Sequence, residues 1–179
     1  MKDISRFILC TLLGWKIKGT FPTNTKKYVI IIAPHTHWVD FPMGLLVRNT
    51  LGLKTNFIGK KSLFNWPHGF IFRALGGTPV DRTKSNNMVD SIVEIFDQKE
   101  VFILTLSPEG TRKKVDSWKT GFYYIAKGAN VPIIRGVLDY EKKVFTLLAP
   151  FFLTDDVKAD IANLRKGYEG IKGKDPEYS

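Results

Sequence analysis

Residues 28–33 read Tyr-Val-Ile-Ile-Ile-Ala, and Pro34 and His35 follow directly. The run is rich in β-branched residues and does not alternate apolar with polar positions, which is typical of a strand buried on both faces of a sheet. A second run of this kind, Val-Phe-Ile-Leu-Thr-Leu, occupies residues 101–106. Strands covered on both faces belong to parallel sheets with helices on each side, so the two runs predict an α/β fold.

Shorter strands and helices alternate around these two runs. Strands are expected at 55–58, 78–80, 132–138 and 144–148, and helices at 39–49, 67–75, 86–99, 122–129 and 154–171. The helix at 86–99 has the clearest apolar stripe, because Met88, Ile92, Ile95 and Phe96 fall on one face. This alternation predicts a single domain with a mostly parallel, mixed β-sheet flanked by helices, and no linker or repeat divides the chain.

The composition limits the partners and the kinds of site. A chain of 179 residues can bury a core without disulfides, and its single cysteine, Cys10, excludes an internal disulfide or a site with several cysteine ligands. The formal net charge is +10, and the cations concentrate in residues 1–30 and 48–84 rather than in the acidic stretch 155–179. An anionic partner is expected, but charge alone leaves nucleic acid, phospholipid and small phosphates open.

The most apolar early segment is Phe7–Trp15. It is too short to span a bilayer, which takes about 20 apolar residues, and it lacks a small-residue cleavage site, so we expect neither a spanning helix nor a signal peptide. One interpretation is a helix lying in a membrane interface, with Arg6, Lys16 and Lys18 at the lipid head groups. The other is a helix packed on the domain.

His35 and Asp40 follow the first buried strand, where ligands of α/β sheets bind. On a regular helix two side chains five positions apart diverge by about 140°, so they can meet only if His35 lies in the loop and Asp40 in the first helical turn. Asp40 would then orient one imidazole nitrogen and leave the other free as a general base. A capping Asp beside an ordinary loop histidine is the alternative. His37 is expected to be structural or near the entrance of the site, because no third ligand completes a metal site.

Two more strand ends carry polar groups. After the second buried strand, Glu109-Gly110-Thr111-Arg112 combines a glycine, a hydroxyl and a guanidinium, which suit an anion cradle or, alternatively, a solvated loop. Residues 76–82 end in Asp81 and Arg82, which alone is more typical of a surface turn. No G-x-S-x-G elbow is present and Cys10 lies in an apolar segment, so direct attack by an alcohol that a histidine deprotonates is the expected chemistry.

Together these three segments resemble the glycerolipid acyltransferases of the 1-acylglycerol-3-phosphate acyltransferase type. The resemblance rests on the order and spacing of His35-x4-Asp40, the stretch from Gly77 to Arg82, and the stretch from Ser107 to Arg112, with residues 131–134 as a fourth block. It covers residues 28–137. It implies an acyltransferase domain over 1–179, with an interfacial segment at 1–20, a catalytic core at 28–150 and a polar C-terminal helix and tail at 154–179.

The resemblance implies transfer of an acyl chain from acyl-CoA or acyl carrier protein to the hydroxyl of a lysophospholipid, most directly 1-acylglycerol-3-phosphate. His35 would be the general base and Asp40 its partner, while Arg82 and Glu109-Gly110-Thr111-Arg112 would hold the acceptor. No metal or other cofactor is implied. The partners are the two substrates and an anionic membrane surface, not nucleic acid, and the expected location is peripheral, on the cytoplasmic face of a membrane.

The fourth block departs from the family, because Arg135 follows where members are usually apolar. This arginine suggests a different acceptor head group, such as that of an acylated amino acid; a structural, salt-bridged arginine is the alternative. A non-catalytic protein that binds membrane surfaces or nucleic acid is the remaining hypothesis. Nucleic acid is disfavoured because basic motifs interleaved with aromatic residues are missing.

Overall fold

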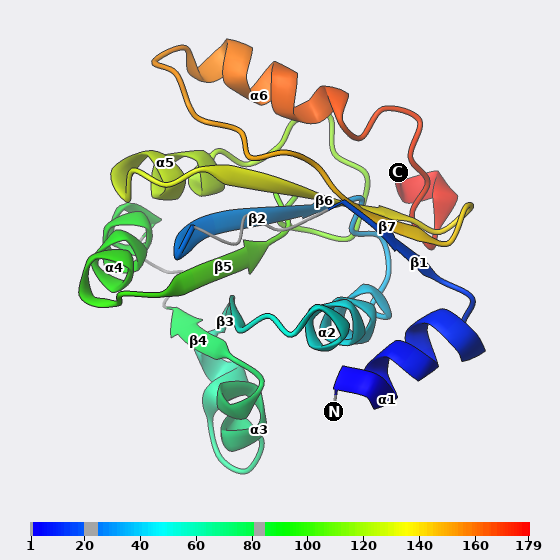
Figure 1. Cartoon of the computed structure of the whole chain (residues 1–179). Helices are drawn as coiled ribbons and strands as arrows, with labels where there is room; N and C mark the ends of the chain where they lie inside the picture. The colour runs from blue at the N-terminus through cyan, green and yellow to red at the C-terminus, as the bar shows by residue number, and fades with distance from the viewer. Residues whose placement is uncertain (1, 20–24, 81–84) are drawn as a thin grey trace.

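A computed structural model describes residues 2–19, 25–80 and 85–179, and it forms one α/β domain around a seven-stranded sheet (Figure 1). The strands are β1 (Lys16–Lys18), β2 (Lys27–Ala33), β3 (Thr55–Lys60), β4 (Gly77–Val80), β5 (Phe102–Leu106), β6 (Ile133–Asp139) and β7 (Val144–Leu147). The helices are α1 (Lys2–Arg6), η1 (Phe7–Leu12), α2 (Asp40–Leu51), η2 (Lys61–Phe64), α3 (Gly69–Ala74), α4 (Ser85–Gln98), α5 (Gly121–Gly128), α6 (Val157–Lys166) and η3 (Pro176–Tyr178).

The strand order is β1-β7-β6-β2-β5-β3-β4. Every neighbouring pair is parallel except β6 with β7, which confirms the predicted mostly parallel, mixed sheet. β2 lies between β5 and β6, so the strand with the longest β-branched run is also an interior strand. Since parallel strands end at the same edge, the segments that follow β2, β3, β4, β5 and β6 all emerge at one edge, called here the carboxyl edge.

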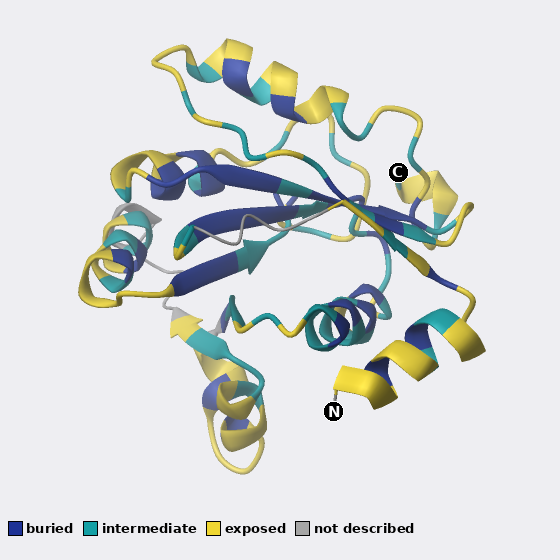
Figure 2. Cartoon of the chain, in the orientation of Figure 1, coloured by how far each residue is buried: buried dark blue, intermediate teal, exposed yellow. Residues whose placement is uncertain are grey.

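Alternate residues of β2 enter two separate cores. Val29 and Ile31 pack with α4, α5 and α6, whereas Tyr28 and Ile30 pack with η1 and α2 on the other face. Figure 2 shows the resulting pattern, with the central strands dark blue between helices that are buried only on their inner sides. Burial on both faces explains why the run carries no polar alternation.

The ends of the chain differ in detail from the sequence-based expectation. The N-terminal segment forms α1 and η1, and Lys16–Lys18 forms an edge strand that the apolar pattern did not predict. Helix α6 spans Val157–Lys166 and is shorter than the predicted 154–171. Asp156 caps its start by accepting a hydrogen bond from the Ala159 N–H, and Gly167 is its C-cap. Among the helices of the described ranges, none is long and apolar enough to cross a bilayer.

The N-terminal segment packs on the domain through some of its apolar side chains and leaves others exposed. Leu9 and Trp15 are buried in the core beside α2. Ile4, Phe7 and Leu12 face outward, each more than half exposed. Packing on the domain therefore leaves one apolar face of this segment uncovered.

Candidate active site

The structure brings His35 and Asp40 together at the carboxyl edge. His35 lies in the loop after β2, and Asp40 is the first residue of α2, which is the arrangement that the five-residue spacing required. The His35 Nδ1 and the Asp40 Oδ2 are 2.9 Å apart. A carboxylate only accepts hydrogen bonds, so Nδ1 carries the proton, and in the neutral form of the imidazole Nε2 is the acceptor nitrogen.

The Asp40 carboxylate is held by several donors. Its Oδ2 accepts from the backbone N–H groups of Thr36 and His37, both at 2.9 Å, and its Oδ1 accepts from the Tyr140 hydroxyl at 2.7 Å. Burial acts to raise the pKa of Asp40, but the hydrogen bonds from His35, the His37 N–H and Tyr140 together lower it more. The pKa of Asp40 therefore lies below its ordinary value, and the group is a fixed anion behind the histidine.

The two side chains differ in exposure. The Asp40 side chain is 4% exposed, whereas that of His35 is 30% exposed. The charged partner is thus shielded from water, which strengthens its interaction with the imidazole. The histidine remains accessible to a molecule that approaches the carboxyl edge.

Tyr140 was not anticipated from the sequence. It follows β6, and its ring packs edge-on against Trp15 with a centroid separation of 5.0 Å. Burial and the hydrogen bond to Asp40 raise the pKa of Tyr140 well above its ordinary value, so the hydroxyl stays a donor. Its contact with Asp40 joins residues 100 positions apart, a separation that no local pattern reveals.

The C-terminal tail covers the same loop. The Asp175 N–H donates to the Thr36 hydroxyl at 3.1 Å, and the Tyr140 N–H donates to the Lys172 carbonyl at 3.0 Å. Gly173 is buried against Thr36, and a Cβ at this glycine would lie 2.5 Å from the Thr36 Oγ1. The tail thus holds the histidine loop in place from outside the sheet.

Glu109 connects the loop after β5 to the histidine. Its Oε2 accepts from the His35 backbone N–H at 2.9 Å and from the Ser107 hydroxyl at 3.1 Å. Burial raises the pKa of Glu109, and these two hydrogen bonds offset that effect only in part. The Glu109 carboxylate is therefore buried against the backbone of His35, and its contact with an acceptor stays a prediction.

The rest of the loop turns toward solvent. Gly110 has φ +66°, a left-handed conformation that favours glycine, and a Cβ there would lie 2.8 Å from the Lys119 Cδ. The Thr111 hydroxyl accepts from the Lys113 N–H at 3.3 Å, and Arg112 is exposed. Lys119, whose own N–H donates to the Pro108 carbonyl, is a further cation at this loop that sequence analysis missed.

The other predicted site residues have different surroundings. His37 accepts a hydrogen bond from the Val39 N–H on its Nδ1 at 3.1 Å, a contact within the loop. Arg135 lies on β6, where its guanidinium donates to the Asn163 carbonyl at 3.4 Å and lies over the Phe151 ring. Neither contact is the ion pair expected for a structural arginine at this position. Arg82 lies outside the described residues.

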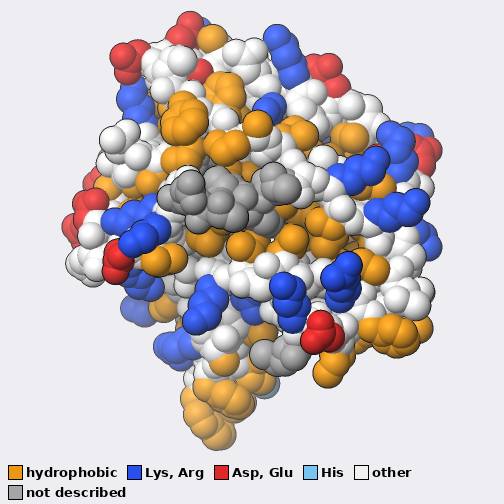
Figure 3. Space-filling model, viewed as in Figure 1, with side chains coloured by type: hydrophobic (Ala, Val, Ile, Leu, Met, Phe, Trp, Pro, Cys, Tyr) orange, Lys and Arg blue, Asp and Glu red, His pale blue; other side chains and the backbone are white. Residues whose placement is uncertain are grey.

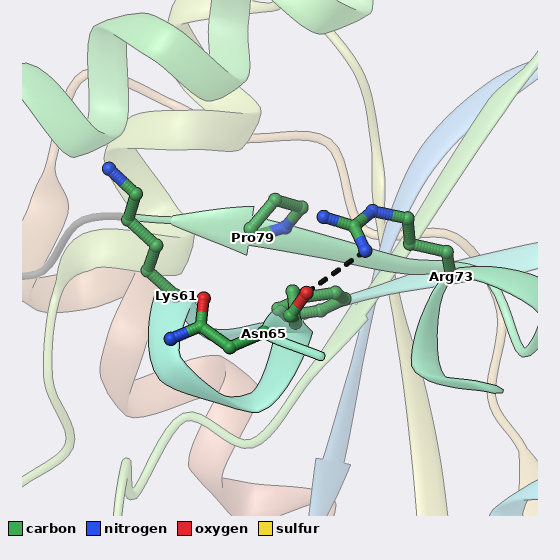
Figure 4. A pocket seen from close by; sticks show the side chains of 5 residues that line it. Lys61, Asn65, Arg73 and Pro79 are labelled. Atoms are coloured by element: carbon green, nitrogen blue, oxygen red, sulfur yellow. Dashed lines mark hydrogen bonds between the residues drawn. The ribbon is translucent and has the colours of Figure 1, made fainter. Parts of the chain in front are cut away.

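An open pocket of about 310 Å³ lies at the carboxyl edge beyond β3 and β4. It is lined by Lys61, Phe64, Asn65, Arg73 and Pro79. Figure 4 shows Lys61 and Arg73 on opposite sides of Asn65, with the Arg73 guanidinium bonded to the Phe64 carbonyl at 3.0 Å. Since β5 separates β3 from β2, the pocket begins roughly 10 Å along the edge from the histidine loop.

Metal ligands are not assembled in the described parts of the chain. Within residues 2–19, 25–80 and 85–179, no group of three or more His, Cys, Asp or Glu side chains is placed to hold a metal ion. The groups that do converge are an imidazole with an accessible nitrogen, a buried carboxylate behind it, and several exposed cations along the same edge. Such a set suits deprotonation of a hydroxyl on an anionic molecule.

Comparison with known proteins agrees with this arrangement. The family model described as Acyltransferase matches residues 15–136. The chain is also similar in structure to the 1-acyl-sn-glycerophosphate (LPA) acyltransferase PlsC from Thermotoga maritima, with a TM-score of 0.61 and 20% identity over 93% of this chain and 77% of that one. None of the curated proteins searched matches the chain. Because the family model covers both the histidine loop and the loop after β5, the resemblance found in the sequence is confirmed, and the chain belongs to the acyltransferase family.

Proposed function

We propose that this acyltransferase moves a fatty acyl chain from a thioester, acyl-CoA or acyl carrier protein, to the free hydroxyl of a lysophospholipid. The observation that carries the proposal is the His35 imidazole, held on Nδ1 by the buried Asp40 and accessible at the carboxyl edge. Among lysophospholipids we propose 1-acylglycerol-3-phosphate, because the Thermotoga maritima relative is described as acting on it and because exposed cations lie along the same edge.

In this scheme His35 is the catalytic base. Its Nε2 takes the proton of the acceptor hydroxyl while the hydroxyl oxygen attacks the thioester carbonyl, so that a new C–O bond forms. The tetrahedral intermediate then expels the thiolate with its electron pair, which breaks the C–S bond, and the proton on His35 passes to that sulfur. Asp40 stays ionised throughout and stabilises the transient imidazolium.

The acceptor phosphate is assigned to the loop after β5. Arg112 is exposed and can bind two phosphate oxygens at once, and the backbone of Gly110 and Thr111 turns in the same loop. Glu109 supports this loop from behind through its contact with the His35 N–H. Arg82 is assigned to the same phosphate on the strength of the family resemblance.

We further propose that the protein works at the cytoplasmic face of a membrane without spanning it. The uncovered face of α1 and η1 supports this proposal, since Ile4, Phe7 and Leu12 are exposed next to the exposed cations Arg6 and Lys16. Apolar residues beside cations are the pattern of segments that lie in the interface of an anionic bilayer.

The test is lipid mass spectrometry on purified His35→Ala and parent protein, with acyl-CoA or acyl carrier protein as donor and lysolipids dispersed in detergent. Loss of the base should lower product formation by about 10²- to 10⁴-fold. His68→Ala is the matched control, because His68 is an exposed histidine outside the site. Equal product from His35→Ala and the parent would refute the mechanism.

Arg112→Ala distinguishes the head groups. A large loss with 1-acylglycerol-3-phosphate and little loss with an acylated amino acid would assign Arg112 to the phosphate. Higher parent activity on the acylated amino acid would replace the proposed acceptor. The contacts of Arg135 with Asn163 and Phe151 do not favour that alternative, since they direct its guanidinium to α6 and not to the histidine loop.

A further inference from the structure

The segment η2–α3 carries large apolar side chains outside the core. Trp66 is 93% exposed and Phe70 is 70% exposed, and Leu63 and Ile71 beside them are each 45% exposed. We call these four residues the aromatic tip. Figure 3 shows hydrophobic side chains gathered on the lowest projection of the molecule, where α3 lies in Figure 1, with Lys and Arg side chains above them. Exposed aromatic residues clustered in this way mark an interaction surface.

The residues beneath the tip are closely packed. Phe64 is buried, and its ring lies so close to β3 and β4 that a Cβ at Gly59 or Gly77 would lie 2.8 Å from it. The Gly69 N–H donates to the Asn65 carbonyl at 2.8 Å, and a Cβ at Gly69 would meet the Phe64 carbonyl. The packing of Phe64 and Gly69 therefore fixes the position from which the side chains of the tip project outward.

The charge around the tip suits an anionic surface. Residues 41–80 contain five Lys or Arg and no Asp or Glu. Of these cations, Lys54, Lys61 and Arg73 are exposed. An apolar projection backed by cations, with no carboxylate in its own segment, is complementary to lipid head groups over an apolar interior.

We propose that the aromatic tip inserts into an anionic phospholipid bilayer, as a docking element distinct from α1 and η1. The inference rests on the proposed function, in which the acceptor is a membrane lipid. η2 starts at the carboxyl edge directly after β3, so insertion of the tip brings that edge, with His35 on it, to the bilayer surface. In Figure 1 the N-terminal helix and α3 both project below the sheet, which allows them to contact one bilayer together.

The experiment measures flotation of the full chain with vesicles of phosphatidylglycerol and phosphatidylcholine in equal parts. Trp66→Ser/Phe70→Ser should weaken vesicle binding by tenfold or more, on the order expected for two large aromatic side chains partly removed from water. The matched control is Phe152→Ser, because Phe152 is 73% exposed but lies in the segment between β7 and α6, and β7 is separated from β3 and β4 by β6, β2 and β5. It should bind like the parent.

Two further measurements test whether the partner of the aromatic tip is an anionic bilayer. Lys54→Gln/Lys61→Gln should weaken binding to the anionic vesicles by about fivefold per charge, with little change on pure phosphatidylcholine. In a Trp38→Phe background, vesicles should shift the tryptophan emission to the blue, and lipids brominated in the acyl chain should quench it. Both changes should be lost when Trp66→Phe is added, which separates Trp66 from Trp15 and Trp118. Trp38 is removed for this test because it is also exposed.

Equal vesicle binding by Trp66→Ser/Phe70→Ser and the parent would overturn the inference. It would also be overturned if the tip were required for self-association, or for a complex with acyl carrier protein, but not for vesicle binding. Failure of the proposed function is separate. It would appear as absent turnover of detergent-dispersed substrates by the parent, whatever the vesicle result.

Discussion

Tyr140→Phe tests whether the buried carboxylate is held as the structure indicates. The change removes the hydroxyl that donates to Asp40 Oδ1 at 2.7 Å and keeps the ring that packs on Trp15. A hydrogen bond to a charged group contributes about 1.5–3 kcal/mol, so we expect a loss of about 2 kcal/mol in the free energy of unfolding at pH 7. For a chain of this length the loss corresponds to a fall in Tm of about 4–8 °C.

The pH dependence of this loss follows from the pKa of Asp40. Because the folded-state pKa is lowered, the stabilisation by Asp40 is fully present above its ordinary pKa of about 3.9 and is lost as the pH falls through the lowered value. Removing the Tyr140 donor raises the folded-state pKa of Asp40. The difference between variant and parent should therefore be largest at neutral pH and shrink below about pH 4.

Denaturant unfolding at pH 7, and again at the lowest pH at which both proteins stay folded, measures the effect. Tyr124→Phe, an exposed tyrosine of α5, is the control and should change stability by less than about 0.5 kcal/mol. Acyl transfer should also fall, by less than for His35→Ala, because Tyr140 acts through Asp40. A Tyr140→Phe protein as stable as the parent, or one whose loss does not vary with pH, would refute the assignment.

Three more predictions concern the same edge. Asp40→Asn keeps the shape of the side chain but removes the charge behind His35, and steady-state kinetics should show a rate about 10²- to 10⁴-fold lower; an unchanged rate would contradict the assigned role. Gly110→Ala should lower the free energy of unfolding by about 1–2 kcal/mol because φ is +66°, whereas Gly44→Ala in open space on α2 should raise it by up to about 1 kcal/mol. Because burial raises the pKa of Glu109, ionisation of its carboxyl group in the folded state lowers the stability of the parent at neutral pH. Thermal unfolding should therefore show that the stability of Glu109→Gln, measured relative to the parent, is higher at pH 8 than at pH 4.

Local patterns were enough to predict most of the elements. The β-branched runs at 28–33 and 101–106 became interior strands because residues without polar alternation can be accommodated only where both faces are covered. The contact of His35 with Asp40 could also be predicted, since only a loop and one helical turn join the two residues and few relative positions are possible. Such features depend on neighbours in the chain, which a single sequence displays.

Contacts between segments that the sheet brings together could not be predicted from local sequence patterns. Glu109 meets His35 across 74 positions, and Tyr140 meets Asp40 across 100. Both contacts depend on β5 and β6 lying on either side of β2, and this strand order is a property of the whole sheet. The chain displays Glu109 and Tyr140 only as a loop acid and a tyrosine after a strand, so nothing in their own segments reveals that they support the same histidine loop.

The aromatic tip illustrates the same division. The pattern at 67–75 predicted a helix, and α3 spans Gly69–Ala74. By sequence, Phe70 and Phe72 are equally suited to a core, yet Phe72 packs toward Phe64 while Phe70 is 70% exposed. The sequence by itself determined most of the strands and helices and the local histidine–aspartate pair, because these follow from spacing along the chain. Only the tertiary structure decided which apolar side chains are covered and which distant groups support the site, because burial depends on what the rest of the chain brings to each face.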